Sequence, residues 1–537
     1  MSRPPDYDVI IVGGGHNGLV CACYLAAAGL KVAVLERRDV VGGAAVTEEF
    51  YPGFRNSVAS YTVSLLHPKV IEDLHLAQHG LEVVLRPQSN FFPLSERECL
   101  SFYRDRAETQ AEIARFCAAD AEALPGYLEM LSGVVAFLRA ELLRTPPNVG
   151  GGFLDLVRAG GTAWRAKNLT LAQRRDVVDM FTKSAAQVLD AWFESDHLKA
   201  AFAFDALVGN FAAPSTPGSA YVLLHHVFGQ VNGIDGAWGH AIGGMGAITA
   251  AMRAEAESLG VEVRTGAEVA GIVVEGGCAT GVRLAGGGVL RGSRIAANVG
   301  PKRLFLEMVD AAHLEAEFLR RIRNFRTVSA SFRMNVALAE LPSFSCRPGT
   351  ATALHHQSGI VIGPTMDYLE RAYLDAREQG WSRRPVVEML IPSTIDTTLA
   401  PPNQHVASLF CQHFAPELPG GASWDDHRER AADAVIDAVT AFAPNFRDAV
   451  IARQIHSPLD LERKFGLTGG DIFHGALSLD QLWSNRPVMG FADYRTPIGK
   501  LYLCGSGAHP GGGVTGIPGH NAAREILADH RRRRRKR

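Results

Sequence analysis

The chain has 537 residues, of which 47% are hydrophobic and 20% are charged, and its formal net charge is −2. This composition excludes a disordered or fibrous protein, and the near-neutral charge excludes a general attraction to nucleic acid. At about 100 to 200 residues per domain, we expect more than one lobe.

The first 36 residues predict a strand, a glycine turn, a helix and a second strand. Residues 8–12 form a short apolar run that enters the turn and is typical of a buried parallel strand. A helix is expected at residues 16–28 and the second strand at residues 31–36. The turn itself is GxGxxG, formed by Gly13, Gly15 and Gly18.

Each of these residue types has a physical role at a dinucleotide site. The first glycine allows the tight turn, the second lets backbone amides reach a pyrophosphate, and the third allows the helix to pack closely on the strand. The positive end of the helix then faces the phosphates. Glu36, at the end of the second strand, can accept hydrogen bonds from ribose hydroxyls. The whole unit therefore predicts dinucleotide binding.

The remaining elements alternate between two patterns. Residues 76–228 are mainly helical, with helices expected at residues 107–117, 123–143 and 171–193. In the next part a helix is expected at residues 247–259, with strands at residues 261–264, 267–274 and 294–299. Further strands are expected at residues 328–336, 386–391, 406–414 and 501–504, the last leading into a glycine-rich loop and a final helix.

This order predicts an α/β fold in which a Rossmann-like domain is built from discontinuous segments and carries an inserted α+β substrate domain. We assign residues 1–75, 236–301 and 455–530 to the nucleotide-binding domain. The substrate domain takes residues 76–235 and 302–454. Residues 531–537, RRRRRKR, are expected to form a basic disordered tail, because like charges repel one another.

Five motifs carry a resemblance to a known family. They are GGGHNGL from Gly13, ERRDVVGGAAVTEEFYPGF from Glu36, HAIGGMGAIT from His240, GGDIFHG from Gly469 and GSGAHPGGGVTGIPGHNAA from Gly505. In order along almost the whole chain, they resemble the phytoene desaturase-related branch of FAD oxidoreductases, which includes carotenoid desaturases, carotenoid isomerases and retinol saturases. The resemblance implies FAD as the cofactor and an FAD-binding fold of the amine oxidase and phytoene desaturase type.

The resemblance also implies which residues bind FAD. The second glycine pair, Gly42 and Gly43, is expected along the pyrophosphate, and the backbone of Val269 beside the adenine. The full predicted set is Gly13, Gly15, His16, Asn17, Gly18, Glu36, Arg37, Gly42, Gly43, Val269, Gly505, Gly512, Gly513, Thr515 and Gly516. No metal site is expected.

The expected function is an FAD-dependent oxidoreductase that moves a hydride to or from flavin N5 on a hydrophobic substrate, such as a polyene or isoprenoid. Desaturation, saturation and isomerisation remain open. The alternatives are an amine-oxidase-like flavoenzyme and a flavin-bearing regulatory protein of a respiratory or membrane complex. Weak candidates for a catalytic residue are His474, His509 and His520, because histidine can exchange a proton near neutral pH.

The sequence also bounds the cellular setting. Eight cysteines follow no disulfide or zinc spacing, and Cys21 and Cys23 read as small core residues rather than a redox pair. These observations favour a cytoplasmic or matrix-like compartment, with peripheral membrane contact left open. The expected partner is a small hydrophobic substrate, and the oligomeric state is not determined.

Overall fold

The computed structural model describes residues 5–329 and 331–536. Its first domain is built on a five-stranded parallel sheet with the strand order β11-β2-β1-β15-β21. The strands are β11 (Glu262–Arg264), β2 (Val32–Leu35), β1 (Val9–Val12), β15 (Ile295–Ala297) and β21 (Leu501–Leu503). The strands β1, β2, β15 and β21 are buried throughout, as expected for a parallel sheet covered on both faces.

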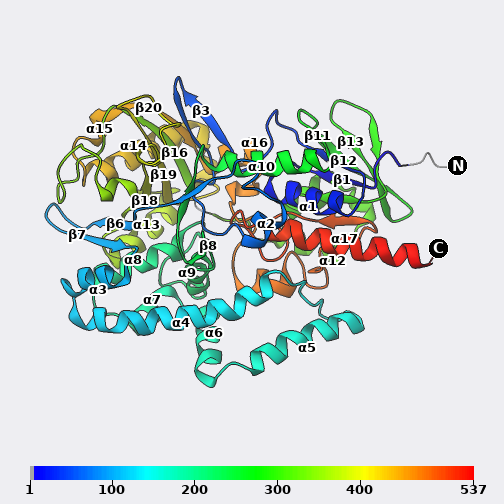
Figure 1. Cartoon of the computed structure of the whole chain (residues 1–537), viewed down its shortest axis with the longest axis horizontal. Coiled ribbons are helices and arrows are strands. Elements are labelled where there is room, and N and C mark those ends of the chain that lie inside the picture. The colour runs from blue at the N-terminus through cyan, green and yellow to red at the C-terminus, as the bar shows by residue number, and fades with distance from the viewer. Residues whose placement is uncertain (1–4, 330, 537) are drawn as a thin grey trace.

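Three helices pack at this sheet, namely α1 (His16–Ala27), α10 (Met245–Ser258) and α17 (Ile517–Lys536) (Figure 1). A three-stranded antiparallel sheet forms the connection between β11 and β15, with strands β12 (Val269–Glu275), β13 (Cys278–Leu284) and β14 (Val289–Arg291). The parallel sheet thus takes strands from residues near the start, in the middle and near the end of the chain.

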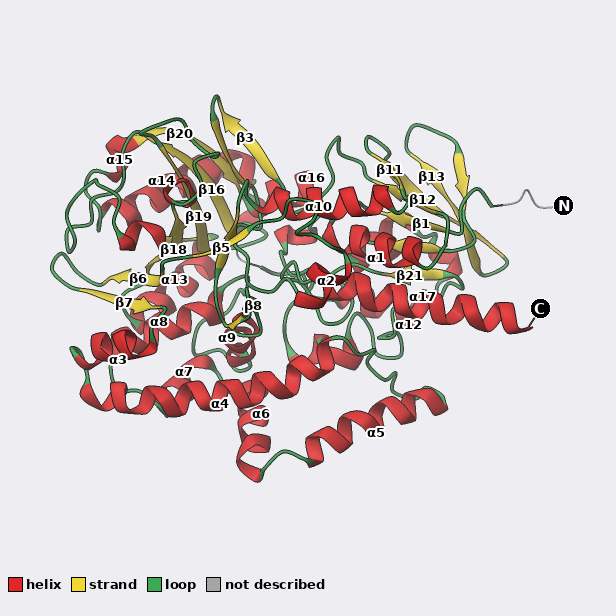
Figure 2. Cartoon of the chain, viewed as in Figure 1, coloured by secondary structure: helices red, strands yellow, loops and turns green. Residues whose placement is uncertain are grey.

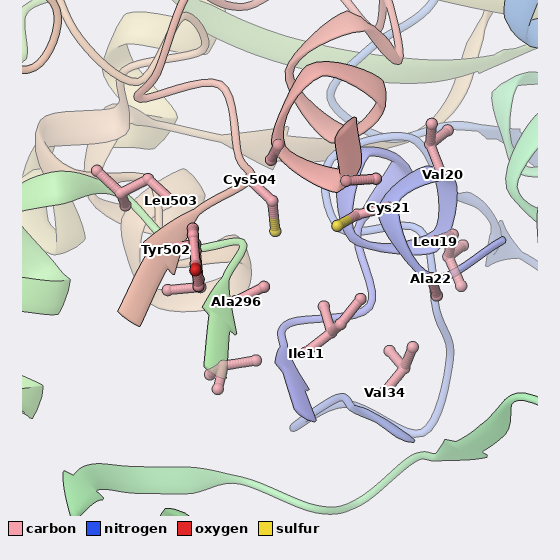
Figure 3. Packing of buried hydrophobic residues seen from close by; sticks show 14 of the residues in the cluster. Ile11, Leu19, Val20, Cys21, Ala22, Val34, Ala296, Tyr502, Leu503 and Cys504 are labelled. Atoms are coloured by element: carbon pink, nitrogen blue, oxygen red, sulfur yellow. The ribbon is translucent and has the colours of Figure 1, made fainter. Parts of the chain in front are cut away.

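Figure 3 shows how α1 meets the sheet. Cys21 on α1 and Cys504 after β21 point toward each other above Ile11 and Ala296. Cys21 and Cys23 are fully buried, which confirms that they are core residues. The contact with Cys504 and burial both raise the pKa of Cys21, so this thiol stays protonated.

The second domain is built on a seven-stranded sheet with the order β20-β16-β19-β18-β17-β6-β7, in which only the β17–β6 pair is parallel. Its strands are β6 (Gln88–Pro93), β7 (Cys99–Tyr103), β16 (Phe332–Leu338), β17 (Gly359–Ile362), β18 (Trp381–Leu390), β19 (His405–Phe414) and β20 (Val450–His456). On β16, Phe332, Met334 and Val336 pack into one core with α14 (Trp424–Thr440). Arg333 and Asn335 alternate with them and therefore face the other side.

Helices cover that other side in the lower part of the view (Figure 2). They are α3 (Arg106–Ala114), α4 (Ala118–Leu142), α5 (Phe153–Lys167), α6 (Leu171–Thr182), α7 (Ala185–Asp190), α8 (Asp196–Leu207) and α9 (Ser219–His226). Within the described part of the chain, α4 alone is long and apolar enough to cross a membrane by length and composition. It buries Tyr127, Leu131 and Leu138 in the protein core.

Shorter elements complete the two domains. The helices are α2 (Pro68–Asp73), α11 (Pro301–Arg303), α12 (Ala316–Asn324), α13 (Met366–Gln379), α15 (Phe446–Ala449) and α16 (Pro458–Phe465). The small two-stranded sheets pair β3 (Thr47–Tyr51) with β4 (Phe54–Ser57), β5 (Val83–Leu85) with β10 (Gly239–Ala241), and β8 (Gln230–Val231) with β9 (Ile234–Asp235).

Two sequence predictions are corrected by the structure. The single helix expected at residues 171–193 is divided into α6 and α7, because Ser184 starts a new helix by a reciprocal capping box with Gln187. The basic end is not extended from residue 531, because α17 continues to Lys536. Arginine is a good helix former and cations are favoured at a helix C-terminus, which offsets the repulsion between like charges. Arg537 lies outside the described residues.

Candidate active site

The first cavity of the site is a cleft of about 800 Å³ at the carboxyl end of the parallel sheet. This edge is where open α/β sheets bind their ligands. Its wall includes residues from each segment of the first domain, at Gly13–Asn17, Glu36–Arg38, Gly42–Ala44, Glu268–Val269, Asn298–Val299, Lys464–Phe465, His474 and Ser506. Of the fifteen predicted cofactor-binding residues, nine line it: Gly13, Gly15, His16, Asn17, Glu36, Arg37, Gly42, Gly43 and Val269.

The glycines of the first turn are required by close backbone contacts. Gly13 has φ +97°, in the region that favours glycine. A Cβ atom on Gly18 would lie 2.3 Å from the carbonyl oxygen of Gly13. Gly18 therefore does not line the cleft but lets α1 pack against the turn, as predicted from its place in the motif.

The start of α1 presents free polar groups to the cleft. Gly15 precedes the helix without a side-chain cap, and the first turn contains no acidic residue. His16 Nε2 and Asn17 Oδ1 are buried and have no hydrogen-bond partner. Burial, with a smaller effect from His474, lowers the pKa of His16 to about 3, so its ring is neutral near pH 7. A helix N-terminus in this state suits an anionic phosphate group.

Glu36 closes the opposite side of the turn. Its carboxylate accepts hydrogen bonds from Gly14 N at 2.8 Å and from Arg38 N at 2.9 Å. Arg37 donates to the carbonyl oxygens of Arg463 and Lys464, which ties this strand end to α16. The acid that we expect to contact ribose is thus held in place by backbone groups.

The second glycine pair lies directly against the first turn. Gly42 N donates to Gly14 O at 2.8 Å, and the two segments form a bridge between Gly15 and Gly42. Asn298, which our reading of the sequence missed, donates from Nδ2 to Gly13 O at 3.1 Å and also lines the cleft. Its signal was present, because it directly follows a parallel strand that ends at the cleft.

The last motif is brought to the first one, although they lie at opposite ends of the chain. Asn17 Nδ2 donates to Ser506 Oγ at 3.0 Å. Gly505 approaches Asn298 so closely that a Cβ atom would lie 2.8 Å from its Oδ1 atom. Gly512 packs on Phe473, Gly513 on Leu65, and Gly516 on Val70, so these three predicted residues do not line the cleft.

A second cavity of about 820 Å³ lies on the far side of the same loop. Pro510 and Thr515 of the last motif line it, whereas Ser506 of that motif lines the cleft. The other lining residues are Leu65, Leu66, His67, Pro68, Arg139, Leu142, Tyr221, His225, Phe228, Gly229, Gln230 and Ile517. Most of this wall is apolar, and none of its described residues is Asp or Glu.

The charges at the second cavity are balanced or absent. Arg139 pairs with Asp235 at 2.8 Å and donates to the carbonyl oxygens of Phe228 and Gly229. Burial lowers the pKa of His225 to about 3, so this ring is neutral, and its Nε2 atom has no partner. The cavity is suited to an uncharged, mostly apolar molecule.

The three candidate histidines fall in different places. His474 lines the cleft, and burial lowers its pKa to about 4. His509 lies outside the linings of both cavities, with its ring near Glu141 O at 3.3 Å and near the ring of Trp483. His520 makes a hydrogen bond with Asn521 and an edge contact with Tyr24. Of the three, only His474 lies where it can face a bound cofactor.

Arg486 organises the loops beside His474 and was also missed from the sequence. It is fully buried and donates to the carbonyl oxygens of Phe473 and Ser506, at 2.7 and 2.8 Å. It therefore holds the GGDIFHG segment against the last motif. No local pattern marks it, because all of its partners are backbone carbonyls from other parts of the chain.

A buried polar cluster lies on the sheet face that turns away from the α14 core. Tyr61 donates to Glu388, and Arg86 lies 3.9 Å from the same carboxylate. Arg333 stacks on the ring of Tyr61 at 4.5 Å and donates to Ser408 Oγ. Tyr61 was a weak expectation for the substrate pocket, and the structure places it in this cluster rather than in the lining of the second cavity.

These observations fit an FAD molecule in the cleft. The glycine cradle leaves room for backbone amides, and the α1 N-terminus is uncapped. The unpartnered atoms of His16 and Asn17 offer further polar contacts there, and the acid at the β2 end completes a dinucleotide site. The described residues contain no group of three or more His, Cys, Asp or Glu side chains that could hold a metal ion.

Comparison with protein families matches residues 18–331 to the family described as flavin containing amine oxidoreductase. A relative from Rattus norvegicus, pyridine nucleotide-disulfide oxidoreductase domain-containing protein 2, is 43% identical over 98% of this chain and 94% of its own length. A limonene dehydrogenase polypeptide of Castellaniella defragrans is 26% identical over 98% of this chain and 96% of its own. A lycopene-forming phytoene desaturase of Pseudescherichia vulneris is 26% identical over 95% and 96%.

Solved structures share the fold. An oxidoreductase from Methanosarcina mazei superposes with a TM-score of 0.59 at 16% identity, over 97% of this chain and 99% of that one. A triple mutant of putrescine oxidase gives a TM-score of 0.58 at 16% identity, over 98% and 99%. These likenesses confirm the predicted α/β architecture.

Proposed function

Because the chain belongs to the flavin-containing amine oxidoreductase family and is an FAD-dependent oxidoreductase, we propose that it moves a hydride between the flavin and a hydrophobic substrate held in the second cavity. The substrate class that we propose is a polyene or isoprenoid. One observation carries the proposal: the loop from Gly505 to Gly516 borders the FAD cleft on one side and an apolar cavity on the other.

The division of labour follows from the geometry. FAD supplies the hydride chemistry when bound. The α1 N-terminus, Glu36 and the glycine pairs hold the dinucleotide, while Arg486 fixes the loop that separates the cofactor from the second cavity. The apolar wall orients the substrate and excludes water, which a carbon-to-flavin hydride transfer requires.

The names of two relatives agree with this substrate class. Limonene and lycopene are both unsaturated isoprenoid hydrocarbons, and the relatives named for them match this chain over nearly its whole length. They do not fix the direction of the reaction.

An amine substrate is the second candidate, since the family description and the putrescine oxidase likeness both refer to amines. The second cavity disfavours it. A protonated amine needs an anionic or strongly polar partner, whereas the described wall contains the cation Arg139 and no carboxylate. A flavin-bearing regulatory role would leave the apolar cavity without a use.

The proposal is tested by filling the second cavity. Leu142 lines it and Leu143 does not, so Leu142→Phe and Leu143→Phe form a matched pair. Purified flavin-loaded protein is incubated anaerobically with a mixture of isoprenoid hydrocarbons in detergent, and changes in unsaturation are followed by mass. We expect Leu142→Phe to lower kcat/KM about tenfold, corresponding to about 1.4 kcal/mol, and Leu143→Phe to stay within about twofold.

The flavin spectrum of both variants should match that of the wild type, because neither residue lines the FAD cleft. Equal turnover in the two variants would show that the second cavity does not hold the substrate. Oxygen consumption with primary amines, without conversion of any hydrocarbon, would favour the amine oxidase alternative.

A further inference from the structure

The helix α5 is amphipathic in the reverse of the usual sense. None of its fifteen residues is buried. Asp155, Arg158, Thr162 and Arg165 recur at intervals of three and four, so they form one polar stripe. That stripe faces the protein: Arg158 pairs with Glu525 at 2.9 Å, Thr162 donates to Glu141 at 2.9 Å, and Arg165 pairs with Glu141.

The apolar side chains of α5 point to solvent instead. Phe153 is 78% exposed, Leu156 68% and Trp164 65%, and Leu154 and Val157 are also exposed. In Figure 2, α5 lies at the lower edge, beyond α4 and away from both sheets. Surface helices normally turn this face toward the core, so an outward apolar face implies an apolar environment outside the protein.

The same segment continues this character on either side of α5. Val149, Leu171 and Val178 are exposed by 59% to 62%. Between residues 149 and 175 the sequence has five basic residues, Arg158, Arg165, Lys167, Arg174 and Arg175, and one acidic residue, Asp155. Lys167, Arg174 and Arg175 are exposed beside the apolar face.

A basic hollow lies behind the helix, between α4, α5 and α17. It has a volume of about 670 Å³ and includes Arg144, Arg158, Arg165 and Arg524 in its wall. Arg144 and Arg524 donate to the carbonyl oxygens of Ala140 and Leu143, and neither forms an ion pair with a described carboxylate. Their charges remain available to an anion outside the protein.

We propose that α5 and its flanks form a docking surface for an anionic lipid bilayer. Exposed Phe, Leu and Trp side chains would enter the interfacial region, while the flanking lysine and arginines would meet anionic headgroups. The charge balance favours a bilayer over a second copy of this chain. Two identical surfaces would bring like positive charges together, whereas an anionic lipid surface neutralises them.

The place of the surface also suits the proposed function, and this consequence alone rests on it. The C-terminal end of α4 borders two hollows, with Arg139 and Leu142 in the wall of the second cavity and Glu141 in the wall of the basic hollow. A hydrophobic substrate dissolved in a bilayer would therefore lie beside the element that lines its cavity.

The test uses the full-length flavin-loaded protein and vesicle flotation. Vesicles of phosphatidylcholine alone are compared with vesicles that also contain phosphatidylglycerol. We expect binding to the anionic vesicles, weaker binding in high salt, and a loss of about tenfold in the triple variant Phe153→Ser/Leu156→Ser/Trp164→Ser. The matched control is Leu374→Ser on α13, where a leucine is 50% exposed away from this surface.

A second variant, Lys167→Glu/Arg174→Glu/Arg175→Glu, should lose the preference for anionic vesicles. Circular dichroism, flavin content and turnover in detergent should match the wild type for all variants, because none of these side chains is buried or lines either cavity. Absence of binding to anionic vesicles, or equal binding by the triple variant, would overturn the proposal. A concentration-dependent dimer that the triple variant abolishes, without vesicle binding, would identify a second copy as the occupant instead. Vesicle binding does not depend on turnover, so these results stand apart from any failure of the proposed function.

Discussion

Asp471 shows how a single buried group constrains the loop that carries His474. Its Oδ1 atom accepts a hydrogen bond from Phe473 N at 2.8 Å, and its Oδ2 atom has no partner. Burial raises the pKa of this carboxyl from 3.8 to about 6, with only partial compensation from the backbone bonds and from Arg486. The residue therefore binds a proton in the folded protein at pH values where the unfolded chain has released it.

This shift predicts a pH-dependent stability difference for Asp471→Asn. Because the folded pKa is raised, the stability contributed by the proton is complete below about pH 3.8 and is lost as pH rises through about 6. The asparagine variant does not titrate, so its unfolding free energy relative to wild type should rise over this window, by on the order of 3 kcal/mol. Urea denaturation of both proteins across the window measures it, and a constant difference would show that Asp471 is ionised in the folded state.

Helices α1 and α17 join the two ends of the chain at the cofactor cleft. Gly519 on α17 lies against α1, where a Cβ atom would be 2.2 Å from Asn17 O. The same contact region contains the hydrogen bond from Asn17 to Ser506. The approach of these helices therefore sets the distance between the first and last motifs.

We predict that Gly519→Ala separates these helices, destabilises the protein by about 1–3 kcal/mol and reduces its flavin content. The ratio of flavin to protein absorbance and the unfolding midpoint report the two effects. Gly160→Ala on α5 is a suitable control, since no atom lies within 4 Å of the added Cβ atom and alanine favours a helix. Normal flavin content in Gly519→Ala would mean that the cleft does not depend on this helix contact.

At the element scale, the sequence was most informative where a local pattern has one physical meaning. The apolar run of β1, the glycine turn and α1 were predicted to within one residue at each end, because strand, turn and helix signals follow one another directly. The break between α6 and α7 was missed, since the apolar positions continue through Ser184 and only its capping contact reveals the interruption. The helix α5 was not predicted because its apolar stripe carries no sign of which side faces the protein.

The whole molecule depends on contacts that no local pattern contains. Arg486 is recognisable only when the carbonyl groups of Phe473 and Ser506 are brought around it. The sequence motifs predicted that the first and last glycine loops meet, which the bond between Asn17 and Ser506 shows. They did not predict that Gly512, Gly513 and Gly516 pack against neighbouring side chains, or that the same loop separates two cavities.

The central claim is that the flavin exchanges a hydride with a hydrophobic molecule across this loop. Its most direct test is anaerobic single-turnover spectroscopy of the flavin-loaded protein, oxidised in one series and chemically reduced in another, mixed with isoprenoid hydrocarbons. We predict that at least one series shows a saturable change of the flavin absorbance band, accompanied by a matching change in hydrocarbon unsaturation, and that Leu142→Phe slows it about tenfold. A flavin that responds to primary amines and oxygen but to no hydrocarbon in either redox state would contradict the claim.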